Sequence, residues 1–101
     1  MRYHLSVNAV NAVNETIARI ESALAAVQRT LDALTARGHE QAAFDVARLQ
    51  FSASIRTSWP GNLAPLASAL ERVAADASLS LSDQERADAR DAAATFRSLV
   101  G

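Results

Sequence analysis

The chain contains no cysteine and no lysine among its 101 residues, and only two prolines and three glycines. The lack of cysteine excludes a disulfide scaffold, a thiolate zinc site and a cysteine nucleophile. The glycines lie at positions 38, 61 and 101, too far apart to form a nucleotide-binding loop. Scarce proline and glycine favour a helical bundle over a sheet fold.

An excess of charge of one sign is also lacking. Ten arginines stand against eleven acidic residues, the formal net charge is −1, and the arginines are scattered between acids rather than clustered. Recognition of nucleic acid or anionic lipid needs a basic face. We therefore expect neither nucleic acid nor a membrane as a partner.

Long apolar runs are missing as well. No run approaches the ~18 residues needed to cross a bilayer. The first residues do not form the charged region, apolar core and cleavage site of a signal peptide. These observations predict a cytoplasmic protein.

The strongest positive feature is an apolar seam in the first third of the chain. Its members recur at alternating intervals of three and four, which places them on one face of a helix. They are Val10, Val13, Ile17, Ile20, Leu24, Val27, Leu31 and Leu34. Full burial of each is worth roughly 1.5–3 kcal/mol, so we expect later segments, or a second copy of the chain, to cover the seam.

The seam predicts a long first helix over about 8–37. Gly38 directly after Arg37 is a usual helix stop. Residues 2–8 stay open between strand, helix and disorder, because their apolar and polar side chains alternate with a period of two.

Three further helices are predicted, over about 40–57, 62–78 and 83–100. Pro60 and Gly61 break the chain before the third helix, and Ser82-Asp83-Gln84-Glu85 has the pattern of a capping box before the fourth. We predict an all-α, four-helix bundle-like fold with residues 1–101 as a single helical domain.

The predicted helix over 40–57 is apolar on both sides of a narrow polar stripe. One flank carries Ala42, Val46, Leu49 and Ala53, and the other carries Phe44, Ala47, Phe51 and Ile55. Such a helix is normally surrounded by neighbours, so we expect it in the middle of the packing. Gln50 and Ser54 lie between the flanks. They either fix the register against a neighbouring helix or contact a small ligand or protein partner.

No catalytic arrangement is visible. His4 and His39 are the only histidines, and His39-Glu40 lacks the second histidine of a zincin helix. The acids of the last helix alternate with arginines, which is typical of a solvated face. We expect no catalytic residue, no bound metal and no cofactor, and hence no enzyme.

The tripeptide Trp59-Pro60-Gly61 resembles the Trp-x-Gly motif of the WXG100 family. That resemblance implies a secreted helical hairpin of about this length that pairs as a dimer. The chain departs from the family pattern in its three breaks and in the absence of a C-terminal tyrosine followed four residues later by an acid.

We expect a small non-enzymatic helical protein that acts by protein–protein interaction, as an adaptor or regulator. A homodimer is expected because the first helix is too long for the other three to cover. The expected contacts are the uncovered end of the seam and the second flank of the 40–57 helix, with Phe44, Gln50, Phe51, Ser54 and Trp59 as candidate residues. The alternatives are a small-ligand sensor with a pocket between helices and a WXG100-like secreted protein.

Overall fold

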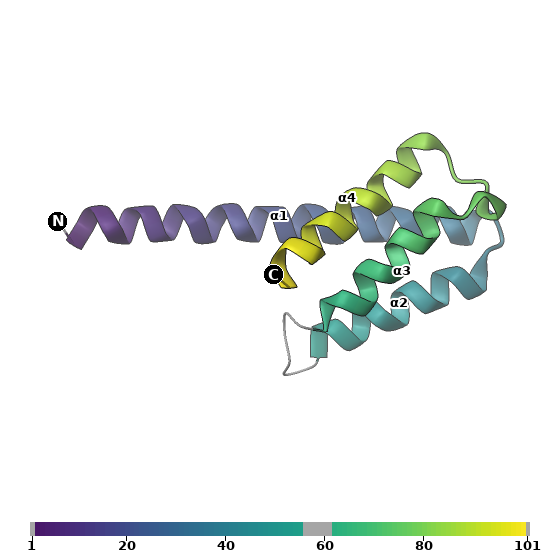
Figure 1. Ribbon diagram of the computed structural model, residues 1–101, viewed down its shortest axis with the longest axis horizontal. Coiled ribbons are helices and arrows are strands. Elements are labelled where there is room, and N and C mark those ends of the chain that lie inside the picture. Colours follow the sequence, from purple (N-terminus) through teal and green to yellow (C-terminus); the bar gives the residue numbers. More distant parts are fainter. Residues whose placement is uncertain (1, 56–61, 101) are drawn as a thin grey trace.

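The computed structural model describes residues 2–55 and 62–100, and the side chains of residues 11–53 and 62–100. The elements in chain order are α1 (Arg2–Ala36), α2 (Glu40–Ile55), α3 (Leu63–Ala75), the short 3₁₀ helix η1 (Ala77–Leu79) and α4 (Asp83–Val100) (Figure 1). None of the described residues forms a strand. The predicted all-α fold with four helices and a long first helix is confirmed.

Two helix bounds differ from the prediction in an informative way. α1 begins at Arg2, so the period-two pattern of residues 2–8 is not a strand. Each asparagine inside the helix costs less than about 0.7 kcal/mol relative to alanine, which a long helix tolerates. α3 ends at Ala75 rather than near residue 78. The Asp76 carboxylate accepts a hydrogen bond from the Ser78 backbone N–H (2.9 Å) and caps η1 instead, because such local bonds compete with a helix.

The predicted end of α1 and start of α4 are confirmed. Gly38 has φ +81°, His39 N–H donates to the Leu34 carbonyl (2.9 Å) and Gly38 N–H to that of Thr35 (3.1 Å), the pattern of a Schellman motif. At α4, Ser82 N–H donates to Glu85 Oε1 (2.8 Å) and Glu85 N–H donates to Ser82 Oγ (3.1 Å). This reciprocal pair is a capping box.

Asn62 precedes α3, but its side chain does not cap that helix. Its amide Nδ2 instead donates to the carbonyl oxygens of Ser52 (3.2 Å) and Ala53 (3.3 Å). Asn62 therefore satisfies carbonyls at the end of α2 and ties α2 to the start of α3.

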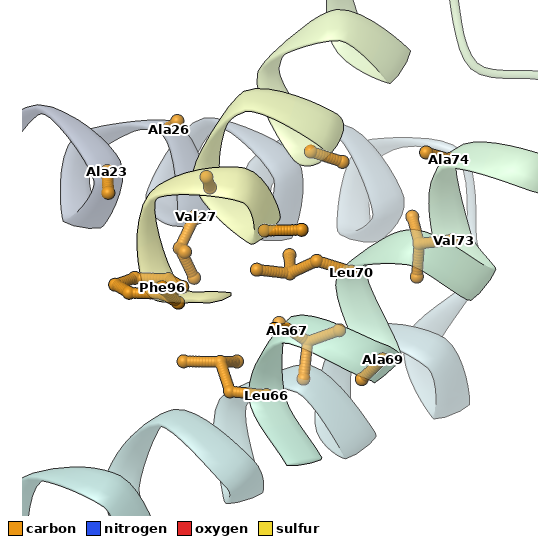
Figure 2. Packing of buried hydrophobic residues seen from close by; sticks show 14 of the residues in the cluster. Ala23, Ala26, Val27, Leu66, Ala67, Ala69, Leu70, Val73, Ala74 and Phe96 are labelled. Carbon is orange, nitrogen blue, oxygen red and sulfur yellow. The ribbon is translucent and has the colours of Figure 1, made fainter. Parts of the chain in front are cut away.

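α3 is the helix with the largest buried share of its residues. α4 packs against α1 and α3, α2 packs against the same two helices, and the α3–α4 contact is the most extensive. Figure 2 shows side chains of α1, α3 and α4 converging around Val27, Leu70 and Phe96. Buried α3 residues are Leu63, Leu66, Ala67, Ala69, Leu70, Val73 and Ala74. The prediction that the 40–57 helix lies in the middle is wrong, because only one of its two apolar flanks is covered.

The long helix α1 is only half covered. Its 35 residues span about 52 Å at 1.5 Å per residue, and its N-terminal half projects beyond the other helices (Figure 1). Val27 and Leu34 are 0% exposed, whereas Val13 is 56%, Ile17 47% and Leu24 37% exposed. The expected uncovered end of the seam is therefore the N-terminal end, and later segments cover only the C-terminal part.

The buried face of α1 is rotated from the predicted seam and includes three alanines beside it. The buried residues of α1 are Ala23, Ala26, Val27, Thr30, Ala33 and Leu34. Ala23 and Ala26 of α1 and Ala92 of α4 line one small depression between the two helices, so small side chains lie on both sides of this contact. The buried Thr30 hydroxyl donates to the Ala26 carbonyl (2.9 Å), so it needs no partner from another helix.

A pair of matched substitutions tests whether the apolar seam of α1 is divided into a buried C-terminal part and an exposed N-terminal part. Val27→Asp places a carboxylate in the core and should cost about 3–5 kcal/mol, enough to unfold a domain of marginal stability. Leu24→Asp, at a partly exposed position of the same seam, should cost less than about 1.5 kcal/mol. Urea denaturation followed by circular dichroism in dilute solution measures both. Equal losses would contradict the division.

The left-handed residue after α1 provides a second test. A Cβ on Gly38 would meet no atom within 4 Å, so Gly38→Ala should lose about 1 kcal/mol of stability through its backbone conformation alone. Ser80 also has positive φ (55°), and Ser80→Gly should change the free energy of unfolding in the opposite direction. Urea midpoints that move the same way in both variants would contradict this interpretation.

Candidate interaction surface

An apolar strip runs along the projecting half of α1. Val13, Ile17 and Leu24 are exposed and Ile20 is half-buried, and all four lie on one helix face. From Val13 to Leu24 the strip is about 16 Å long. We call these four residues the free seam. Single exposed apolar side chains are ordinary on a protein surface, whereas a contiguous row of them is less common.

α2 adds two aromatic side chains to the apolar surface. Phe44 is 61% and Phe51 66% exposed, and they lie seven residues apart on the same face of α2. The opposite flank is in the core, where Val46 is 1% and Ala53 2% exposed. Of the second flank of α2, predicted as a contact surface, Phe44 and Phe51 are therefore exposed and Ala47 is half-buried, while the side chain of Ile55 lies outside the described residues.

A groove between α1 and α2 extends the free seam toward Phe44. It has a volume of about 330 Å³. Its lining consists of Gln28, Leu31, Asp32 and Thr35 from α1 and Glu40, Ala43, Phe44 and Ala47 from α2. Leu31, the seam residue after Val27, forms part of its apolar wall. We call this feature the α1–α2 groove.

Ion pairs link α1 to α4 along the packed contact between the two helices. Arg29 Nε lies 3.1 Å from Asp88 Oδ2, with a second bond from Nη2 to Oδ1 (3.2 Å). Arg37 Nη2 lies 2.8 Å from Glu85 Oε1. Nearer the projecting half, Arg19 Nη2 donates to Ser98 Oγ (3.1 Å).

The sequence pattern suggested that all acidic residues of α4 lie on a solvated face. This is wrong for two of them. Glu85 and Asp88 are half-buried against α1. The Arg29 guanidinium lowers the pKa of the Asp88 carboxyl from its ordinary value of 3.8. The Ser82 backbone N–H and the Arg37 side chain lower the pKa of Glu85 from 4.5. Alternation of acids and arginines in the sequence could not reveal these pairs, because the paired arginines belong to α1.

The other predicted contact residues have different outcomes. Gln50 is half-buried and engaged in an interaction. Ser54 lies in α2, but its side chain is outside the described residues, as is all of Trp59. The depression between α2 and α3, lined by Ala42, Asp45, Val46, Ala69, Arg72, Val73 and Asp76, does not include Gln50. That depression therefore offers no support for a ligand pocket oriented by Gln50 and Ser54.

Neither a metal cluster nor a membrane span occurs in the part of the chain that the structure describes. Within it, no three side chains of His, Cys, Asp or Glu gather closely enough to hold an ion. No described helix is both long and apolar enough to cross a membrane.

Comparisons of the chain with protein-family models, curated proteins and solved structures give no match. The WXG100 resemblance stays confined to the tripeptide around Trp59. Four helices with breaks after Ala36 and around η1 differ from the two-helix hairpin that the resemblance implies.

Sequence reasoning missed the direction from which α4 covers α1. The signal was present in the alanines at positions 23, 26 and 33, which lie beside the seam at helical spacing. Small residues mark where a neighbouring helix can approach closely. Leu24 and Leu31 thereby fall at the edge of the covered face, where they remain available to another surface.

Acid should weaken the α1–α4 contact. Because the folded-state pKa values of Glu85 and Asp88 are lowered, their contribution to stability is fully present above their ordinary values and is lost as pH falls through the folded values. The free energy of unfolding should be flat from about pH 7 to 5 and fall below about pH 4.5. Urea denaturation at a series of pH values measures this.

The double variant Glu85→Gln with Asp88→Asn is the control. It retains polar side chains at both positions but cannot gain protons, so its stability should fall less steeply with acid. Some decline will remain, because the pKa values of Glu71 and Asp76 are also lowered, by Arg97 and Ser78 respectively. If the free energy of unfolding falls with acid equally steeply in the wild type and the double variant, Glu85 and Asp88 are not responsible for the loss of stability.

Proposed function

We propose that this protein acts by binding another protein through the free seam and the α1–α2 groove, and not by catalysis. The observation that carries the proposal is the exposure of Val13, Ile17 and Leu24 on a helix that projects from the bundle (Figure 1). Its role would be that of an adaptor or regulator, with the bundle as the scaffold that holds α1.

Physical chemistry favours an apolar helical partner. Side chains spaced as in the free seam fit into the holes of a facing helix, and each one buried contributes roughly 1.5–3 kcal/mol. The exposed Phe44 and Phe51 would supply aromatic anchors of the kind that dominate binding energy at interfaces. The cytoplasmic location stays a prediction.

The small-ligand sensor stays the alternative. It gains no support from the depression between α2 and α3, since Gln50 is not part of its lining. The free seam, in contrast, is built from large apolar side chains that a protein surface would cover.

Binding should depend on the free seam. In affinity capture from the source cell, Ile17→Glu should reduce the amount of bound partner at least about tenfold, because the loss of one buried isoleucine contact is worth more than 1.4 kcal/mol. Quantitative mass spectrometry of the captured proteins provides the measurement.

Ala18→Glu is the matched control, since it adds the same charge at the next residue, which is exposed and lies on another side of α1. It should leave capture unchanged. If wild type, Ile17→Glu and Ala18→Glu capture the same proteins in the same amounts, the free seam is not a binding surface and the proposal fails.

A further inference from the structure

We infer that the partner of the free seam and the α1–α2 groove is an amphipathic helix whose apolar face is bordered by lysine or arginine. This inference rests on the proposed function and names the chemistry of its partner. The observation that supports it is the distribution of charge around the groove. Carboxylates line one side of the contact surface, while the described arginines of α1 are engaged with α4.

The α1–α2 groove has apolar walls and an acidic rim. Leu31, Ala43 and Phe44 contribute apolar side chains to its lining. Among the described residues that line it, the only charged ones are Asp32 and Glu40, both exposed. Neither carboxylate belongs to an ion pair among the described side chains. An occupant that places a cation at this rim is attracted, and one that places a carboxylate there is repelled.

The acidic border continues from the groove along the free seam. Glu21 is exposed and lies seven residues before Gln28, which lines the groove, so both lie on the same side of α1. The border on the other side of the free seam, at Thr16 and Ala23, carries no charge. A partner helix that lies along the free seam therefore meets carboxylates on one side only.

The described arginines of α1 do not neutralise this border, because they contact α4. Arg29 Nε lies 3.1 Å from Asp88 Oδ2, and Arg19 Nη2 donates to Ser98 Oγ (3.1 Å). On α2, Arg48 is exposed but is not part of the groove lining. The basic side of the partner is therefore expected over α1 and the start of α2, away from Arg48.

A second copy of the chain matches this surface less well than a basic helix. It presents the same carboxylates, Glu21, Asp32 and Glu40, so pairing through these surfaces gains no attraction from charge. A helix with lysine or arginine beside its apolar face is attracted at each of the three. One exposed ion pair changes affinity by up to about fivefold, and three act together on a helix that spans the surface.

The first test compares the binding of two synthetic peptides to the purified full chain. Both have leucine at the a and d positions of about three heptads, and they carry either lysine or glutamate at e and g. Fluorescence anisotropy at low salt should show at least about tenfold tighter binding of the lysine peptide. The difference should shrink in about 0.5 M salt, which screens exposed charges. Equal affinities, or no binding of either peptide up to about 1 mM, would overturn the inference.

A matched pair of substitutions locates the effect. Asp32 accepts a hydrogen bond from Gln28 (3.0 Å), and Asp45, in the depression between α2 and α3, accepts one from Gln41 (3.1 Å). Asp32→Arg and Asp45→Arg therefore remove equivalent local bonds at exposed positions and change the net charge equally. Asp32→Arg should reduce the preference for the lysine peptide at least about fivefold, and Asp45→Arg should leave it unchanged. An equal preference in the two variants would overturn the inference.

The two proposals fail in different ways. If both peptides bind equally and Ile17→Glu weakens both, the free seam binds a helical partner and only the charge of that partner is wrong. If Ile17→Glu changes neither peptide binding nor affinity capture, the proposed function itself is wrong. A wild-type dimer by light scattering that excludes both peptides would show a second copy on this surface and would overturn the inference.

Discussion

The contact between α4 and the C-terminal half of α1 is the constraint on which the rest of the structure depends. Alanines on both helices allow the two backbones to approach closely, and Phe96 and Val27 fill the space beside them (Figure 2). The Arg29–Asp88 and Arg37–Glu85 pairs lie along the same contact. Because α4 covers the face of α1 that carries the alanines, Leu24 and Leu31 lie at the edge of the covered face.

Because of its length, α1 extends beyond this contact and leaves an apolar surface uncovered. α4 has 18 residues and α1 has 35, so no arrangement of α2, α3 and α4 in this bundle can cover α1 along its whole length. The longest extent of the molecule, 56 Å against 28 and 19 Å, reflects that mismatch. The uncovered part is apolar on the same face as the covered part. A chain under no demand to bind anything would gain solubility from polar residues there.

Much of the fold could be predicted because it rests on short-range patterns. The bounds of α2 and α4, the stop at Gly38 and the capping box at Ser82 follow from residues a few positions apart in the chain. The candidate surface was less predictable. Phe44 and Phe51 were expected on a free flank and are exposed, whereas the half-burial of Gln50 reflects the position of neighbouring helices, which the sequence pattern does not contain. The position of α2 was predicted wrongly, because apolar residues on both of its flanks suggested burial on both sides, whereas α1 and α3 cover only the flank that carries Val46 and Ala53.

The sequence alone determined that the chain is helical, where most helices begin and end, and that one long apolar seam runs along the first. These are consequences of periodicity and capping, which act within a few turns of helix. Only the tertiary structure decided which part of that seam is buried. Val27 and Leu24 belong to one pattern, yet one is 0% and the other 37% exposed, because α4 packs on the side of α1 that carries the alanines and Val27 and leaves Leu24 at the edge of the covered face.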